Sequence, residues 1–148
     1  MDEQEYRATY GSINPLRCVF EKSINSRQSN CQCATRFNLA DREGVSCKRD
    51  NAQKRCVSFL EILRGKARFA LQLKDIDSPL PHTAEIKVQN GGLRAVVSSL
   101  NAEESCLSDI DGLLEQATAR WHDLESLPYE DIVREVLRYT PRRRRKKS

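Results

Sequence analysis

Apolar residues between positions 50 and 71 recur mainly at steps of three and four. They are Ala52, Cys56, Phe59, Leu60, Leu63, Ala67, Ala70 and Leu71. This spacing predicts an α-helix with one buried face, because an α-helix completes a turn every ~3.6 residues. Asp50 has the side chain of a helix N-cap and marks the expected start. Cys56 is therefore expected on the buried face, near the N-terminal end of the helix.

Two further stretches have the same helical spacing. The segment NAEESCLSDIDGLLEQATARW opens with Asn101, and Glu104 follows three residues later, an arrangement close to a capping box. Its apolar stripe consists of Leu107, Ile110, Leu114, Ala117 and Trp121. A last helix is predicted from Pro128, at its first position, to Tyr139, and Pro141 stops it.

The segment LPHTAEIKVQNGGLRAVVSSL combines two patterns. Its first half alternates apolar and polar residues as in a strand, while its second half has helical spacing. The alternating positions are Ala84, Ile86 and Val88, and the helical ones are Leu93, Val96, Val97 and Leu100. We expect two short helices that meet at Gly91 and Gly92, with these glycines in a turn of positive φ. A short β-hairpin near residues 84–97 is the alternative.

These elements predict a mainly α-helical fold. The chain has 148 residues, about the size of one domain, and 39% of them are hydrophobic, which is enough for a modest core. We expect a single small helical domain over residues 1–140. A cysteine-rich loop and helix segment would form its N-terminal side, and residues 101–140 its acidic helical part. Residues 141–148 are expected to form a disordered basic tail.

Charge is distributed unevenly along the chain, which the net charge of +4 conceals. Residues 1–73 hold thirteen Lys or Arg and eight Asp or Glu, whereas residues 74–141 hold six and thirteen. We expect a solvated helix face for several of the acidic residues, namely Glu103, Glu104, Asp109, Asp111 and Glu115. The tail adds six consecutive cations, Arg142, Arg143, Arg144, Arg145, Lys146 and Lys147. Such a run has the charge to bind nucleic acid, an anionic membrane surface or an acidic protein.

Five of the six cysteines fall between residues 18 and 56. The spacing C-x-C-x13-C-x8-C is formed by Cys31, Cys33, Cys47 and Cys56. Cys18 is an additional or substitute member of this set. Sulfurs two residues apart can face one centre from a turn, but in a helix they point about 200° apart. We therefore expect a CQC loop, then a helix from near Ala34 to near Gly44, with Cys47 after its end.

The expected compartment is the cytoplasm. The N-terminal stretch MDEQEYRATYGS is acidic and polar and lacks the pattern of a secretory signal. No run approaches the ~18 apolar residues of a membrane span, so no transmembrane segment is expected. In a reducing compartment, clustered cysteines bind metal more often than they form disulfides. A disulfide between Cys31 and Cys33 would also close a small strained ring.

The cluster has features of two kinds of four-thiolate metal centre, an iron–sulfur cluster such as 4Fe–4S and a zinc ion. The segment has neither the paired C-x2–4-C nor the histidine that structural zinc usually uses. Its spacing also matches neither of the common ferredoxin runs. Either centre would carry net negative charge, which the Lys and Arg residues around the cysteines would stabilise. We place an iron–sulfur cluster slightly ahead of zinc as the cofactor.

Other roles for the cysteines stay open. A redox or disulfide switch would use the thiols directly, while a buried free cysteine can also serve as a small apolar residue. The packing role suits Cys106, which lies on an apolar helical stripe. At Cys56 the packing role competes with the role of metal ligand. The two histidines, His82 and His122, lie far from the cysteine segment in sequence, and no pair of carboxylates stands out as acid and base. We therefore expect a protein that is not an enzyme.

The sequence thus predicts a helical protein with a metal centre at Cys31, Cys33, Cys47 and Cys56, or with Cys18 among the ligands. Its expected role is electron transfer, redox sensing or the structural support of an accessory protein, together with a protein partner. The competing prediction is a helical interaction module without metal. Such a module would bind proteins or nucleic acid through its acidic face and basic tail.

Overall fold

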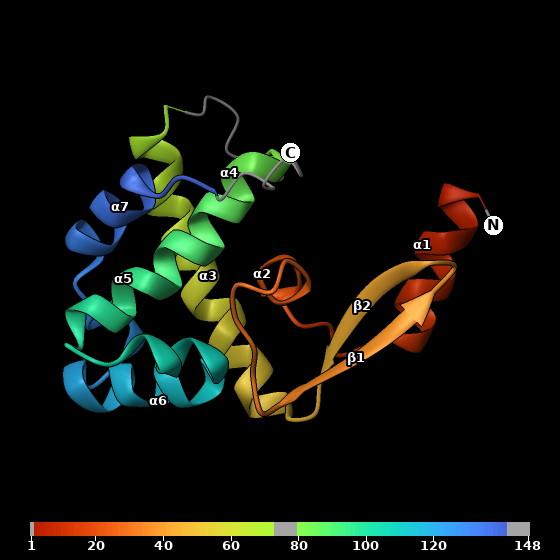
Figure 1. Cartoon of the computed structure of the whole chain (residues 1–148), viewed down its shortest axis with the longest axis horizontal. Helices are drawn as coiled ribbons and strands as arrows, with labels where there is room; N and C mark the ends of the chain where they lie inside the picture. Colours follow the sequence, from red (N-terminus) through yellow and green to blue (C-terminus); the bar gives the residue numbers. More distant parts are fainter. Residues whose placement is uncertain (1, 73–79, 142–148) are drawn as a thin grey trace, which may run out of the picture.

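The structure is a computed structural model, and it describes residues 2–72 and 80–141. Figure 1 shows its elements, which are α1 (Glu3–Ile13), α2 (Glu21–Asn25), β1 (Ala34–Leu39), β2 (Arg42–Cys47), α3 (Asp50–Ala70), α4 (His82–Ile86), α5 (Gly92–Ser99), α6 (Ile110–Trp121) and α7 (Tyr129–Arg138). A π-helical turn over Lys87–Gly91 joins α4 to α5, and 3₁₀ helices cover Glu104–Ser108 and Leu124–Ser126. The expected mainly α-helical fold is confirmed.

The helices α3, α5, α6 and α7 pack together on one side of the molecule, and the β1–β2 hairpin extends away from them (Figure 1). Helix α1 lies against the far half of the hairpin. The helical body has an apolar core that includes Phe59, Leu63, Leu93, Leu114 and Ile132, each at most 1% exposed. The hairpin contacts this body through α2 and α3.

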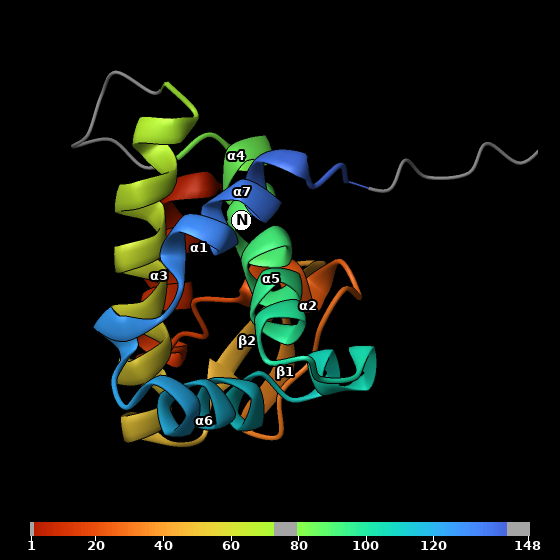
Figure 2. The ribbon, with the colours of Figure 1, turned by 90° about the vertical axis from the view of Figure 1, so that its left-hand side faces the viewer.

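Helices α3 and α7 agree with the helices that the apolar spacing predicts. The buried residues of α3 are Ala52, Phe59, Leu60, Leu63 and Ala67, all on one face. Asp50 is the first helical residue, and Arg49 takes the N-cap position instead. In α7, Pro128 and Tyr139 are the caps rather than the end residues. Figure 2 shows α6 lying across the beginning of α3, with α7 packed further along it.

The helix predicted from Asn101 is divided in two by a break at Asp109. Asp109 has a non-helical backbone, with φ −144°, so the 3₁₀ helix ends at Ser108 and α6 begins at Ile110. Two backbone hydrogen bonds hold a distant loop at this break. Asn30 N–H donates to Leu107 O at 2.9 Å, and Ile110 N–H donates to Asn30 O at 3.0 Å. The break is therefore the attachment point of the loop that leads into the CQC segment.

The helix expected from near Ala34 to near Gly44 is wrong, because this segment forms the β1–β2 hairpin. Its register pairs Leu39 with Arg42, so only two residues, Ala40 and Asp41, form the loop. Both have positive φ, 49° and 67°, as in a two-residue turn of type I′. Such turns usually contain Asn-Gly or Asp-Gly, so the Ala-Asp pair carries no recognisable hairpin signal.

The alternative hairpin near residues 84–97 is also wrong, since this segment is helical throughout. Gly91 and Gly92 have φ −64° and −63°, so the expected turn of positive φ does not form. Their small size serves helix packing instead. A Cβ on Gly91 would lie 3.0 Å from Cα of Val136 in α7, and one on Gly92 would overlap Cδ2 of Leu63 in α3. The glycine pair thus allows α7 and α3 to approach this helix closely.

We expect Gly91→Ala to lower the free energy of unfolding by about 1–3 kcal/mol, the usual cost of overpacking a core. The added methyl group would meet the backbone of α7, which no side-chain rotation can move away. Gly65→Ala is the matched control, because Gly65 is also helical and nothing lies within 4 Å of its Cβ position. Alanine has the higher helix propensity, so this control should be neutral or stabilising. Equal stability of both variants in urea unfolding would contradict the packing role of Gly91.

Helices α1 and α2 are not predicted by the sequence patterns. Helix α1 has no buried residue that would create an apolar stripe. Polar and aromatic contacts hold it to the hairpin instead. Arg42 forms a salt bridge with Glu3 at 2.8 Å and lies over the ring of Tyr6, 4.3 Å from its centroid.

Candidate metal centre

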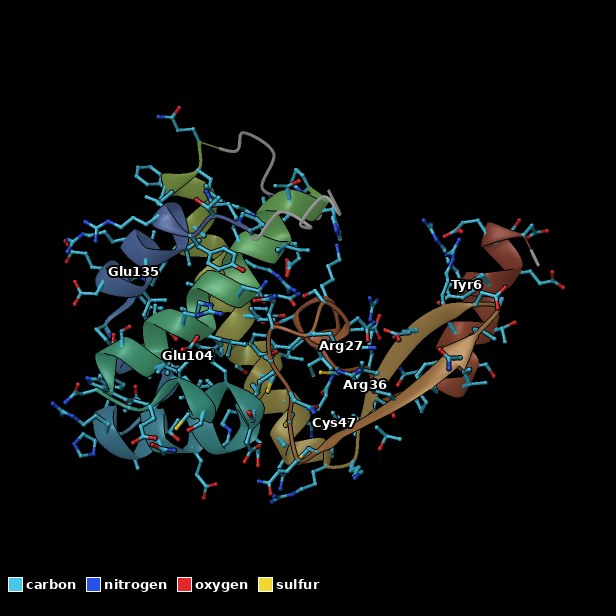
Figure 3. All side chains as sticks on the ribbon, in the orientation of Figure 1. Tyr6, Arg27, Arg36, Cys47, Glu104 and Glu135 are labelled. Carbon is cyan, nitrogen blue, oxygen red and sulfur yellow. The ribbon has the colours of Figure 1, made fainter. Side chains whose placement is uncertain are left out.

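Five of the six cysteines line one small cavity at the base of the hairpin, beside the start of α3. The cavity has a volume of about 20 Å³, and its wall includes Cys18, Cys31, Cys33, Cys47 and Cys56. Figure 3 shows Cys47 at this place, where β2 leads towards α3. All of these cysteines are free thiols. The structure therefore brings together every cysteine that the sequence analysis assigned to a metal site.

Backbone pairing places Cys18 beside Cys47. The segment before α2 runs antiparallel to β2, with Cys18 N–H donating to Val45 O at 3.0 Å and Cys47 N–H donating to Leu16 O at 2.8 Å. Alternate residues of a strand point to the same face, so Cys18 and Cys47 share a face with Leu16 and Val45. Val45 is fully buried on this face. Two sulfurs from separate segments are thus presented to the same side of the sheet.

Cys31 and Cys33 lie in a tight turn that leads into β1, as the CQC spacing predicts. Ala34 N–H closes the turn by donating to Cys31 O at 3.1 Å. Cys33 N–H donates to Cys31 Sγ at 3.4 Å, and the backbone of Asp111, in the first turn of α6, lowers the pKa of Cys31 against the effect of burial. Such donors, and the positive end of a helix dipole, favour the thiolate form.

Cys56 comes from the buried face of α3, and Ala52 and Gln53 complete that wall of the cavity. Ile110 and Asp111 close the cavity from the side of α6. An ion bound here would therefore join the hairpin and its preceding segment to α3. Through Cys31, it would also lie next to the start of α6.

Burial makes these thiols weak acids. It raises the pKa of Cys18 to about 12 and that of Cys33 to about 11, and it also raises the pKa values of Cys31 and Cys56. The neighbouring charges of Cys31 and Cys47 raise the pKa values of Cys18 and Cys56 further. These four thiols are therefore protonated at neutral pH without metal, and metal binding must release their protons.

Asp111 is buried, which corrects the expectation that it lies on a solvated helix face. Its side chain is 3% exposed and forms one salt bridge with Arg55 and another, at 3.7 Å, with Arg49. Gln32 Nε2 also donates to the carboxylate at 3.3 Å. The burial of Asp111 could not be predicted, because its partners are distant in sequence. Three of the other acidic residues expected on that face are exposed, namely Glu103, Glu104 and Glu115.

The sulfurs share the cavity without forming a finished metal site. In the described part of the chain, no group of three or more Cys, His, Asp or Glu side chains is arranged as a metal site. A single torsion positions the sulfur of cysteine, and rotation between its staggered rotamers moves Sγ without moving the backbone. Metal binding at this cavity would therefore begin with rotation of cysteine side chains.

The remaining residues considered in the sequence analysis lie outside the cavity. Cys106 packs against the hydrophobic core, as the packing interpretation predicts. His82 begins α4 and His122 follows α6, and both are exposed. The basic tail from Arg142 to Lys147 lies outside the described residues.

Comparison with known proteins adds no family to this description. No family model matches the chain, and neither a curated protein nor a solved structure matches it. Among the residues that the structure describes, no helix combines the length and the apolar character needed to cross a membrane. The geometry of the cavity is therefore the basis of the functional proposal.

Proposed function

We propose that the protein binds a single metal ion through cysteine thiolates at this cavity, and that the ion has a structural role. The supporting observation is that five cysteines from four separate segments of the chain line one cavity. Inert packing explains single buried cysteines, but it does not explain why five cysteines line the same cavity. Four of them would act as ligands. The sequence spacing favours Cys31, Cys33, Cys47 and Cys56, with Cys18 as the substitute.

Zinc is the ion that fits this cavity best. The cavity volume of about 20 Å³ is close to the ~10–15 Å³ that one water-sized occupant needs. A zinc ion with four thiolates places one atom at the centre, whereas a 4Fe–4S cluster places four irons and four sulfides inside the same shell. The sequence-based preference is therefore reversed in this proposal, and the iron–sulfur cluster becomes the alternative.

Two arginines next to the cavity support a negatively charged centre. Four thiolates around a zinc ion leave a net charge of about −2. The positive charge of Arg55 opposes the burial that raises the pKa of Cys56, and Arg49 acts in the same way on the pKa of Cys33. Both arginines also form salt bridges with Asp111. Their position would lower the cost of holding several thiolates together.

The proposed role is structural because four protein ligands leave no open coordination position for a substrate. A two-stranded hairpin is only marginally stable by itself. Here the hairpin extends from the helical body (Figure 3), and the cavity-lining residues lie at its base and at the start of α3. A metal ion at this point would cross-link the hairpin to α3.

The test is the metal content of the full chain, purified in reducing buffer without chelator. We expect about one zinc ion per chain by elemental mass spectrometry. Cys47→Ser is expected to remove most of this zinc, because Cys47 lines the cavity from β2, which pairs with β1 on one side and with the Cys18 segment on the other. Cys106→Ser is the matched control, and its zinc content should equal that of the wild-type protein.

Two results would change the proposal. Iron and a visible absorption band after anaerobic purification would establish the iron–sulfur alternative. If neither metal is present, and if added zinc leaves the thermal stability unchanged, the cavity is a packing site and the proposal fails.

The basic tail has a separate predicted role that the metal centre does not address. Binding of nucleic acid or another polyanion by Arg142–Lys147 stays a prediction, as does the protein partner. Deletion of the tail, followed by a salt titration of DNA binding, would test it. On duplex DNA each phosphate contact contributes a slope of about −0.9 in log affinity against log salt, so the deletion should flatten the slope.

A further inference from the structure

We propose that Cys18, Cys31, Cys47 and Cys56 hold the metal ion, and that Cys33 stays an unligated thiol beside it. This assignment rests on the proposed metal centre and replaces one of the four ligands that the sequence spacing favours. Two features of the structure support it. They are the backbone hydrogen bond to the sulfur of Cys31 and the faces of the strands.

A backbone N–H group is directed at the sulfur of Cys31. Cys33 N–H donates to Cys31 Sγ at 3.4 Å. Hydrogen bonds of this kind orient ligands and stabilise the charge of metal-bound thiolates. Cys33 therefore contributes a donor to the ligand next to it.

Strand register separates Cys33 from Cys47. Ala34 is paired with Cys47, and Lys48 N–H donates to Cys33 O at 2.8 Å, which continues the pairing by one position. Cys33 lies in the turn just before β1, at the register position opposite Lys48, and the side chains of successive register positions alternate between the two faces of a sheet. Cys18 shares the face of Cys47. An ion bound on that face is thus on the same side of the sheet as Cys18.

Cobalt(II) substitution tests this assignment in the full chain. Cobalt takes the tetrahedral sites of zinc, and its sulfur-to-metal charge-transfer bands grow with the number of thiolate ligands. We expect Cys33→Ser to keep the four-thiolate spectrum of the wild-type protein. Cys18→Ser should lose the intensity of one thiolate. Its cobalt affinity should fall by more than the ~10–100-fold that is typical of changes outside the ligand shell.

The variant Cys18→His is a control that separates the loss of a ligand from misfolding of Cys18→Ser. In Cys18→His, an imidazole replaces one thiolate, so the spectrum should change to that of three sulfurs and one nitrogen, and affinity should recover relative to Cys18→Ser. A residue with only a packing role would not produce this spectroscopic change. In Cys33→His the ligand set should stay that of the wild-type protein.

The possible failures are distinguishable. A wild-type protein that binds neither cobalt nor zinc would end the proposal of a metal centre altogether. If the wild-type protein binds cobalt, but Cys33→Ser loses a thiolate and Cys18→Ser keeps all four, only the ligand assignment is overturned. Loss of a thiolate in both variants would overturn it as well.

Discussion

Asp111→Ala is expected to lower the free energy of unfolding by about 3–5 kcal/mol, the usual cost of removing one partner from a buried ion pair. The side chain of Asp111 is 3% exposed and lies next to Arg55 and Arg49. Its removal would leave the guanidinium of Arg55 without its main charge partner. The Nε atom of Arg55 is already buried and has no hydrogen-bond partner among the described residues. The variant also loses the contact between α6 and Gln32 in the CQC turn.

Urea unfolding of the full chain measures this effect. Glu104→Ala is the matched control, because Glu104 forms a salt bridge with Arg94 at 2.9 Å but has a side chain that is 73% exposed. Exposed pairs contribute up to about 1 kcal/mol, so the control should change stability little. A double-mutant cycle with Arg55→Met separates the coupling of the pair from the cost of an unpaired guanidinium. An effect of Asp111→Ala no larger than that of Glu104→Ala would contradict the buried role of this carboxylate.

If the protein holds the proposed metal ion, its removal with a chelator is expected to expose the hairpin while the helical body stays folded. The body has its own apolar core, whereas the hairpin is a two-stranded sheet that relies on its attachment to α2 and α3. At a free metal concentration ~1,000 times the dissociation constant, binding stabilises the folded state by about 4 kcal/mol. Hydrogen exchange with and without chelator should therefore show loss of protection in β1 and β2 and retained protection in α5 and α7.

Zinc added after the chelator should restore the protection of the hairpin, and Cys106→Ser should respond as the wild-type protein does. Loss of protection throughout α5 and α7 would mean that the metal supports the whole fold rather than the hairpin. Unchanged protection in β1 and β2 would contradict a structural role for the metal.

The helices with a continuous apolar stripe could be predicted because the spacing of their apolar residues indicates which face of each helix is buried. Helices α3 and α7 are examples, and their ends lie within one residue of the expected positions. Helix α1 has no buried residue, so no stripe was present to indicate it. Gly91 was misinterpreted for a related reason. Its conformation is ordinary, and its importance comes from Val136, which approaches it from another helix.

The gathering of the cysteines could be predicted from their positions, but their geometry could not. The position of Cys18 beside Cys47 depends on the pairing of the segment before α2 with β2, and the pairing of β1 with β2 depends on a tight turn at Ala40 and Asp41. Neither residue type favours positive φ strongly enough to predict this turn. Asp111 illustrates a second limit. Its charge suggested exposure, and only the folded chain brings it next to arginines from the start of α3.

The attachment of the CQC turn to the start of α6 has a consequence for biosynthesis. Gln32 N–H donates to Asp109 Oδ1, and these two residues are 77 positions apart in the sequence. Ribosomes add about 5–20 residues per second, so the cysteine segment is made several seconds before the part of the chain that covers it. During this interval the nascent thiols are open to oxidants and to competing metals. We therefore expect the yield of native protein to depend on the redox conditions at the ribosome as well as on the stability of the finished fold.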